Sequence, residues 1–296
     1  MIYFTSFIIS LILTFFLIRV GNKYGIEDKA TDNPLKIHSV STPVLGGIAM
    51  FGAVSLVLLI LDFSAHVALV AAGFIIFLFG FIDDLAWRDK LANIYKLLLM
   101  LPFVVFATIV LILGGYSLNI LPVYFIVEIM TFLAIFLMIN SVNFWDGMDG
   151  ITGAAVAVSF LGFFLITSSP IPLVMILAIL GFLVFNLPPA KIFMGDSGAY
   201  YLGFMLATLS MTMIPEYGFR EFIGVLLILG LPLYEGLSTP IRRIFKKQSI
   251  VKGDRDHFFD GFLKKGYSVN KTLAICTFIH FVLVVIGLLI YGYTFV

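Results

Sequence analysis

Long apolar segments alternate with short polar loops along the whole sequence. A helix that crosses the hydrocarbon core of a bilayer needs roughly 20 apolar residues, and about ten such segments can be placed on the chain. Two uncharged stretches are too long for one span, and glycine, serine and proline residues divide them at 114–117 and 168–172. We expect membrane-spanning helices near residues 2–20, 45–61, 66–82, 97–114, 121–140, 151–168, 171–187, 198–214, 221–241 and 272–296. The pattern predicts an all-α, polytopic bundle in one integral membrane domain, residues 1–296.

The composition agrees with this interpretation. Hydrophobic residues make up 61% of the sequence and charged residues 12%, and the mean hydropathy is +1.12. Residues 1–18 have neither a charge nor a convincing cleavage site, so we expect a first span rather than a removed signal peptide. The single cysteine, Cys276, excludes an internal disulfide and a Cys-x-x-Cys redox motif.

The distribution of positive charge predicts how the helices are threaded. Short connections between paired spans place five loops on one side of the membrane, and these loops carry every Lys and Arg residue except Arg220. Because loops rich in Lys and Arg stay inside the cell, we expect a multi-pass protein of the cytoplasmic (inner) membrane with both termini outside. The five cytoplasmic loops would be 19–44, 83–96, 140–150, 188–197 and 242–271.

The loop at 140–150 places carboxylates between strongly apolar segments, where charge is costly. Asn140, Asn143, Asp146 and Asp149 recur every three residues, which would gather them on one stripe of a helical turn. Carboxylate and amide oxygens suit Mg²⁺, which takes few protein ligands and leaves room for substrate phosphates. A helix cap followed by a tight turn explains the same stretch without a metal.

Three further polar motifs lie on the same predicted face, and each also has a structural explanation. Asp83 and Asp84 close the third span, where they either face a site or cap the next segment. Asp196 opens the eighth span and is either an N-cap or part of a phosphate-binding helix start. The charged run 254–260 is either a solvated surface, a site for anionic lipid headgroups or an attractant for a diphosphate.

The first predicted cytoplasmic loop adds Lys36 and His38 before the pair Gly46–Gly47, which favours close backbone packing or a turn beneath a ligand. The sequence has no Walker loop, no His-Glu-x-x-His and no Gly-x-Ser-x-Gly. Phosphate binding would therefore depend on a metal ion, basic side chains and helix ends.

Taken in order, these motifs resemble those of the polyprenyl-phosphate N-acetylhexosamine-1-phosphate transferases, the relatives of WecA, TagO and MraY. The similarity covers about residues 25–261. It implies an enzyme that transfers N-acetylhexosamine-1-phosphate from a UDP-sugar to undecaprenyl or another polyprenyl phosphate, releasing UMP and starting cell-envelope glycans such as lipopolysaccharide or teichoic acid. The matching pieces are the segment from Pro34 to Gly47, Asp83–Asp84, Asn-x-x-Asn-x-x-Asp-Gly-x-Asp-Gly at 140–150, Asn186-Leu-Pro-Pro and Phe193-Met-Gly-Asp-Ser-Gly.

The resemblance also implies roles for individual residues. The metal ligands would be Asn143 and Asp196, holding Mg²⁺, or Mn²⁺ as an alternative, on the diphosphate. Asp83 or Asp84 would orient or deprotonate the attacking prenyl phosphate, and Asp146 would support the metal and the diphosphate. Contacts to the nucleotide would come from Asp149, Asn186, Phe193 and Gly147, with Phe193 stacking on uracil. Contacts to the phosphates or the sugar would come from Lys36, Lys96, Arg255 and His257.

One motif departs from the family pattern. WecA-like members continue after the position of His257 with further histidines, whereas this chain has Phe258, Phe259 and Asp260. The loop contacts the sugar side in relatives, so the identity of the sugar stays open. The missing histidine cluster places the chain closer to WecA and TagO than to MraY.

The chemistry leaves two routes open. A phosphate monoester has a second pKa near ~6, so the acceptor is largely ionised at neutral pH and needs no strong base. Phosphoryl transfer depends on positioning and charge neutralisation, which favours direct in-line attack on the β-phosphorus with Asp83 positioning the acceptor. A covalent aspartyl-phosphate route is the alternative.

Two other classes of function compete with the transferase. An ion-coupled transporter would use acids at the middle of the membrane, and Glu128 and Glu235 are candidates for that role, for buried pairing or for a prenyl groove. An inactive scaffold of a glycan-assembly complex is the third class. For the transferase, the expected partners are a UDP-N-acetylhexosamine, a polyprenyl phosphate and membrane lipids, with no nucleic acid, and a homodimer is one option for its assembly.

Overall fold

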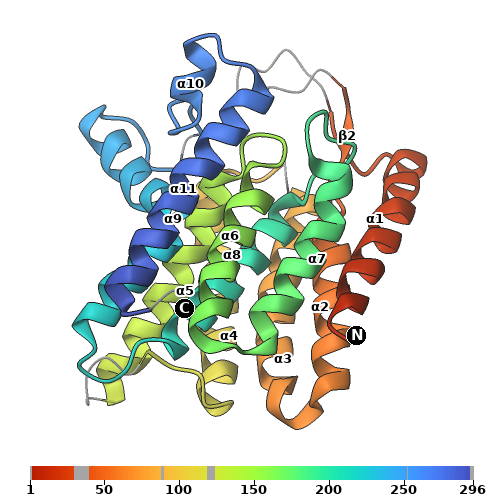
Figure 1. Cartoon of the computed structure of the whole chain (residues 1–296). Helices are drawn as coiled ribbons and strands as arrows, with labels where there is room; N and C mark the ends of the chain where they lie inside the picture. Colours follow the sequence, from red (N-terminus) through yellow and green to blue (C-terminus); the bar gives the residue numbers. More distant parts are fainter. Residues whose placement is uncertain (1, 30–39, 88–89, 119–123, 252, 294–296) are drawn as a thin grey trace.

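The structure is a computed structural model, and it describes residues 2–29, 40–87, 90–118, 124–251 and 253–293. The described residues include ten long helices. They run roughly side by side through the molecule (Figure 1), and each overlaps one of the ranges expected from the apolar pattern. They are α1 (Phe4–Tyr24), α2 (Gly46–Leu61), α3 (Phe63–Ile82), α4 (Asn93–Leu113), α5 (Tyr124–Trp145), α6 (Ile151–Thr167), α7 (Pro170–Asn186), α8 (Gly195–Thr212), α9 (Phe219–Phe245) and α11 (Val269–Tyr291). The smaller elements are β1 (Glu27–Asp28), β2 (Thr42–Pro43), the π-helical turn η1 (Asp83–Trp87) and α10 (Asp260–Lys264).

The predicted all-α membrane bundle is confirmed. Among the described residues, six helices are long and apolar enough to cross a membrane, namely α1, α3 with η1, α4, α5, α9 and α11. The apolar helices α2, α6 and α7 are shorter, with 16 or 17 residues each. The number of membrane crossings therefore stays a prediction.

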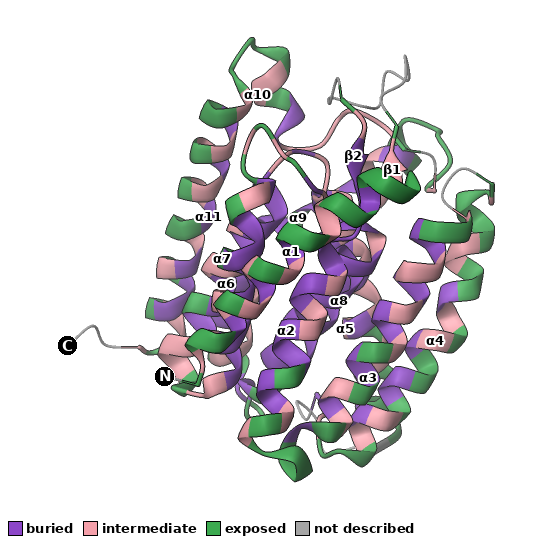
Figure 2. Cartoon of the chain, turned by 90° about the vertical axis from the view of Figure 1, so that its right-hand side faces the viewer, coloured by how far each residue is buried: buried purple, intermediate pink, exposed green. Residues whose placement is uncertain are grey.

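Helix α8 forms the centre of the bundle and packs against α2, α3 and α5 (Figure 2). Its residues from Ser197 to Met211 are all buried, whereas α1, α4 and α11 expose apolar side chains on their outer faces. Glycine permits this close packing, because a Cβ on Gly203 would lie 2.5 Å from the Met138 carbonyl oxygen of α5. The start of α8, which carries Asp196, is thereby fixed from several sides.

The polar loops gather at one end of the bundle. Figure 1 shows β2, α10 and the loops that precede α6 and α8 at the upper end, while α1 begins and α11 ends at the opposite end. This arrangement agrees with the charge pattern, which predicts one loop-rich face.

Helix α9 is broken in the middle. Gly230 has φ 46° and ψ −123°, a left-handed conformation that favours glycine, and Pro232 follows it without a backbone N–H. The second half of α9, from Leu231 to Phe245, therefore takes a direction of its own toward the loop-rich end, where it carries Glu235 and Arg243.

Candidate active site

A cavity of about 600 Å³ opens at the loop-rich end between α4, α5, η1, the start of α8 and the second half of α9. Its polar wall consists of Asp83, Asn93, Lys96, Asn140, Asn143 and Asp196. Its apolar wall consists of Leu97, Met100, Leu133, Phe136 and Leu137, on α4 and α5. The cavity thus joins a charged end to an apolar channel between two helices.

Asp83 is the most deeply buried acid of this cavity, with 1% of its side chain exposed. Lys96 Nζ lies 2.5 Å from Asp83 Oδ1, and the Asp196 carboxylate lies beside Asp83. Asp83 Oδ2 is buried and has no hydrogen-bond partner among the described residues. Two neighbouring carboxylates and one lysine leave an excess of negative charge, which attracts a further cation.

Asn143 connects α5 to the start of α8. Its Nδ2 donates a 2.8 Å hydrogen bond to Asp196 Oδ1, across 53 positions of sequence. Because an ionised carboxylate only accepts, this bond fixes the orientation of the amide and turns Asn143 Oδ1 away from Asp196. The cluster therefore presents the carboxylate oxygens of Asp83 and Asp196, with an amide N–H of Asn143 directed at Asp196.

Asp84 has a different partner from Asp83. Its carboxylate accepts hydrogen bonds from the backbone N–H groups of Asp196, at 2.9 Å, and Ser197, at 3.0 Å, at the start of α8. Gly195, at φ 71°, leaves room for this contact, because a Cβ there would lie 2.5 Å from Asp84 Oδ2. Asp84 does not line the cavity, so in this structure it holds the start of α8 in place.

The stripe of four polar side chains predicted at 140–150 is interrupted where α5 ends. Asn140 and Asn143 lie on the helix and line the cavity, whereas Asp146 and Asp149 follow Trp145 and do not line it. Asp149 Oδ2 accepts a 2.9 Å hydrogen bond from Ala190 N. The helix end, rather than a continuous turn, decides which of these side chains meet.

The residues expected to contact the nucleotide lie on two adjoining loops and at the end of α7. Asn186 Oδ1 accepts a 3.2 Å bond from Gly150 N, and Asn186 Nδ2 donates a 2.8 Å bond to Ile192 O. The carboxamide of Asn186 thus ties the loop after α5 to the loop before α8. Phe193 is bonded through its backbone, donating to Pro43 O at 2.7 Å and accepting from Gly46 N at 3.0 Å. Contacts of these side chains to a nucleotide stay predictions.

The pair Gly46–Gly47 serves close packing, one of its two expected roles. A Cβ on Gly47 would lie 2.5 Å from Gly198 N and 2.6 Å from Ser197 Oγ, and one on Gly46 would meet Phe182 at 2.3 Å. The starts of α2 and α8 can approach each other this closely only without side chains at these positions.

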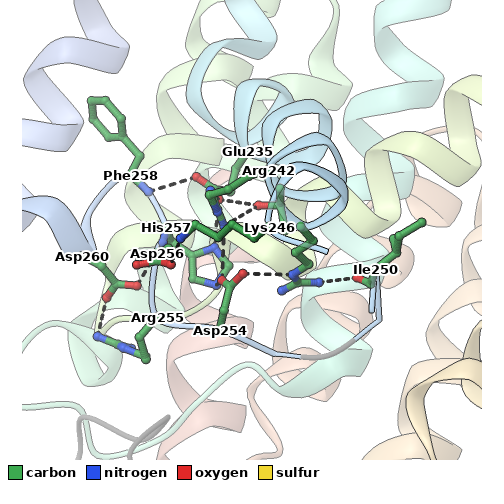
Figure 3. A network of polar contacts seen from close by, with 12 residues as sticks. Glu235, Arg242, Lys246, Ile250, Asp254, Arg255, Asp256, His257, Phe258 and Asp260 are labelled. Carbon is green, nitrogen blue, oxygen red and sulfur yellow. Dashed lines mark hydrogen bonds and ion pairs between the residues drawn. The ribbon is translucent and has the colours of Figure 1, made fainter. Parts of the chain in front are cut away.

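Glu235 is the centre of a second polar network, shown in Figure 3. The side chain is fully buried, and its Oε1 lies 2.9 Å from His257 Nδ1 and accepts a 2.6 Å bond from Thr239 Oγ1. Its Oε2 accepts a 3.0 Å bond from Phe258 N. Of the roles considered for Glu235, buried pairing is the one observed, and it attaches the loop before α10 to α9.

Two arginines of α9 bind the same loop through Asp254, and Figure 3 labels one of them, Arg242. Arg243 Nε lies 3.0 Å from Asp254 Oδ2, and Arg242 lies 3.2 Å from Asp254 Oδ1. Burial acts to raise the pKa of Asp254, but the hydrogen bond from Arg243 and the two positive charges outweigh it, so the pKa is lowered. Arg243 also donates a 2.5 Å bond to Ile250 O, which places Ile250 and Val251 over the cavity.

Of the three positions that depart from the family pattern, Phe259 and Asp260 are buried and Phe258 is half-buried. The Phe259 ring stacks on His257 at 5.6 Å and meets Trp145 edge to face at 5.7 Å, and a Cβ on Gly147 would lie 2.6 Å from it. Asp260 pairs with Arg255 and accepts a bond from His257 N. Burial raises the pKa of Asp260, although Arg255 opposes the shift.

Several expected site residues lie elsewhere. Lys36 falls outside the described residues, and neither His257 nor Arg255 lines the cavity. Glu128 lines a separate, apolar cavity of about 360 Å³ between α4 and α5.

Within the described part of the chain, no three His, Cys, Asp or Glu side chains cluster as a metal site would require, so any metal would rely on amide and substrate oxygens as well.

Sequence reasoning missed the Glu235 network as a unit. Its members come from two segments, 235–243 on α9 and 250–260 in the loop that follows. These segments meet only because of the direction that α9 takes after its break. The signal present in the sequence was an isolated acid in an apolar run, with Thr239 and Arg242 four and seven positions later, on the same helix face.

Comparison with known proteins agrees with this geometry. Glycosyl transferase family 4 matches residues 66–214, which include Asp83, Lys96, Asn143 and Asp196. A probable undecaprenyl-phosphate N-acetylglucosaminyl 1-phosphate transferase of Bacillus subtilis is 29% identical over 94% of this chain and 82% of its own length.

Two further relatives carry related names. An undecaprenyl-phosphate alpha-N-acetylglucosaminyl 1-phosphate transferase of Thermotoga maritima is 30% identical over 86% of this chain and 80% of its own length. A phospho-N-acetylmuramoyl-pentapeptide-transferase of Streptococcus mutans is 31% identical over 76% of this chain and 75% of its own length. With the family match, these similarities show that the chain belongs to glycosyl transferase family 4.

Proposed function

We propose that this protein transfers N-acetylhexosamine-1-phosphate from a UDP-sugar to undecaprenyl phosphate or a similar polyprenyl phosphate, releasing UMP. The observation that carries the proposal is the cavity between α4 and α5, where Asp83, Lys96 and Asp196 meet an apolar channel. A phosphate on a long hydrocarbon chain needs such a combination, with charge at one end and apolar side chains behind it. The names of the relatives contain undecaprenyl phosphate and N-acetylglucosaminyl 1-phosphate, which supports this acceptor and this transferred group.

The residues of the cavity fit a divalent cation. Asp83 Oδ2 is buried without a hydrogen bond, and the Asp83 and Asp196 carboxylates adjoin. The Asn143 amide, which here donates to Asp196, would turn to offer its oxygen to the metal. Mg²⁺ prefers such oxygens and accepts few protein ligands. We assign its binding to Asp83, Asn143 and Asp196, with Mn²⁺ as an alternative. Bound there, the metal would neutralise charge on the diphosphate of the donor.

Lys96 and Asp83 would position the acceptor phosphate. Lys96 supplies a positive charge that is 12% exposed toward the cavity, and its ion pair with Asp83 fixes the direction of that charge. The prenyl chain would then lie along the apolar wall of α4 and α5. Because the acceptor phosphate is already ionised near neutral pH, we favour direct in-line attack, in which the acceptor oxygen bonds to the β-phosphorus as the bond to UMP breaks.

The nucleotide would bind at the loops after α5 and before α8. Asn186 and Asp149 hold these two loops together, and Phe193 and Gly147 lie on them. Asp146 follows Asn143 by three residues but does not line the cavity, so support of the metal and the diphosphate by Asp146 stays a prediction. We place this end of the bundle on the cytoplasmic face of the inner membrane, with about ten crossings, because the basic loops gather there.

The test uses purified protein in detergent or nanodiscs with Mg²⁺, undecaprenyl phosphate and a panel of UDP-sugars. We expect release of UMP and formation of one lipid-linked phosphosugar, with both lost when the metal is chelated and restored by added Mg²⁺. Absence of product with every donor would contradict the proposal and favour the transporter or the scaffold. Transfer of a labelled phosphosugar to the protein without acceptor would contradict direct attack only.

A further inference from the structure

His280 is buried in the middle of α11 and takes no part in the site described above. Its ring lies against the break in α9, where a Cβ on Gly230 would be 2.5 Å from His280 Nδ1. Ser159 of α6 lies on the other side of the ring, with its Oγ 2.9 Å from His280 Nε2. Three helices thus meet at one hydrogen-bonded histidine.

The break leaves two backbone groups of α9 without their usual helical partners. Pro232 has no N–H to donate to Ile228 O, and the turn at Gly230 removes the N–H of Leu231 from the regular helical ladder. Both groups are nevertheless bonded. Ser159 Oγ donates a 2.8 Å bond to Ile228 O, and Leu231 N donates a 3.2 Å bond to His280 Nδ1.

These bonds determine the state of the imidazole. A backbone N–H can only donate, so His280 Nδ1 must carry a lone pair, and the proton of the neutral ring must be on Nε2. Nε2–H then donates to Ser159 Oγ, whose own proton is directed at Ile228 O. An imidazolium, or the other neutral tautomer, would leave Leu231 N–H without an acceptor.

We propose that His280 and Ser159 form a clip that fixes the direction of the second half of α9 and so positions the active site. This half of α9 contributes Gly236 and Pro240 to the cavity, and its Glu235 and Arg243 hold the loop that covers it. His280 and Ser159 are positioning residues, since both act on the cavity through α9. Their effect on catalysis rests on the proposed transferase function, whereas their effect on α9 does not.

The structural part of the proposal is tested by the distance between α9 and α4. Spin labels at Ile244 and Leu98, both exposed, would be measured in a Cys276→Ala background. We expect one narrow distance distribution in the parent protein and a broadened or displaced one in Ser159→Ala, with Ser159→Thr, which keeps the hydroxyl, restoring it. An unchanged distribution in Ser159→Ala would overturn the clip.

A matched control removes another buried membrane serine. Ser55 on α2 is 9% exposed, and its Oγ has no hydrogen-bond partner among the described residues. Ser55→Ala should therefore leave both the distance distribution and the turnover unchanged. A response equal to that of Ser159→Ala would show general loosening of the bundle and would contradict the proposal.

The tautomer is tested by ¹⁵N NMR of histidine-labelled protein, with the His280 signals assigned by their loss in His280→Phe. We expect the neutral ring with its proton on Nε2, and a proton on Nδ1 would overturn the assignment. If the parent protein is an active transferase, Ser159→Ala should lower kcat about five- to tenfold. If the parent shows no transfer, the proposed function fails, and the spin-label and NMR results still decide the clip.

Discussion

Lys96 Nζ lies 2.5 Å from Asp83 Oδ1, although Lys96 belongs to α4 and Asp83 to the turn that ends α3. The pair sits where the charged end of the cavity meets its apolar wall. A positive charge held at this junction can receive a phosphate whose hydrocarbon chain stays among apolar side chains. The relationship leads to a prediction about Lys96.

Lys96→Gln should weaken use of the polyprenyl acceptor. We expect kcat/KM for the acceptor to fall about tenfold or more, because the lost charge is the one proposed to contact the phosphate, with a smaller change in KM for the nucleotide sugar. Steady-state kinetics with each substrate varied in turn measures both values. As a control, Lys90→Gln removes an exposed lysine from the connection between η1 and α4. This variant should leave the kinetic constants for both substrates unchanged. Equal losses for the two substrates would contradict a role at the acceptor phosphate.

Asp196→Asn should abolish metal-dependent turnover. The substitution keeps the size of the side chain but removes one of the two adjoining carboxylates, so we expect a loss of at least about 10²-fold at saturating Mg²⁺. A Mg²⁺ titration of turnover, with circular dichroism to check the helical content, measures the effect. Unchanged turnover would remove Asp196 from the site.

Asp83→Asn and Asp84→Asn should separate catalysis from positioning. The two carboxylate oxygens of Asp84 each accept a hydrogen bond from a backbone N–H at the start of α8. An amide has only one oxygen, so asparagine can accept only one of these two bonds with the same geometry. We expect Asp84→Asn to lower the free energy of unfolding by about 1–3 kcal/mol, the cost of an unsatisfied buried donor. Asp83→Asn should reduce turnover with a smaller loss of stability, because it removes the repulsion by Asp196. Thermal unfolding and turnover of both variants test this, and the reverse order would contradict it.

The loop before α10 should stay attached to α9 across the neutral pH range. The lowered pKa of Asp254 means that its ion pairs stabilise the folded loop above the ordinary value of 3.8 and are lost as the pH falls through the folded value. We expect protection of residues 246–268 against proteolysis or hydrogen exchange to be constant from about pH 8 to 5 and to fall below about pH 4.

A matched pair of variants tests the same loop at neutral pH. Asp254→Asn removes the partner of Arg242 and Arg243 and should expose the loop. Asp256→Asn removes ion pairs with Lys246 and Lys264, both largely exposed, and should change little. Equal protection in the two variants would show that the arginine pairs do not hold the loop.

The positions of the long helices could be predicted from the sequence, because each long apolar run has room for only one or two membrane-spanning helices. The sequence also indicated that Asp83, Asn143 and Asp196 share one end of the bundle, since the basic loops define that end. It did not distinguish Asp83 from Asp84, because the π-helical turn η1 decides which carboxylate faces the cavity. Nor did it show where Asp146 and Asp149 separate from Asn143, which depends on where α5 ends.

The Glu235 network was beyond prediction for a different reason. Its bonds to His257 and Phe258 require the direction that α9 takes after Gly230 and the fold of a loop without regular structure. Neither follows from periodicity. The same holds for Phe259, whose contacts with Trp145 and Gly147 join two distant loops.

The enclosure of α8 has a consequence for how lipid composition affects this protein. Asp196 stands on a helix that the bundle surrounds, whereas Lys96 stands on α4, whose outer face is exposed. A thicker or thinner bilayer changes the tilt of helices at the perimeter first. Bilayer thickness should therefore alter the spacing between Lys96 and Asp196, the residues proposed to bind the acceptor phosphate and the metal. The turnover rate should then vary with acyl-chain length in reconstituted membranes even where the fold does not.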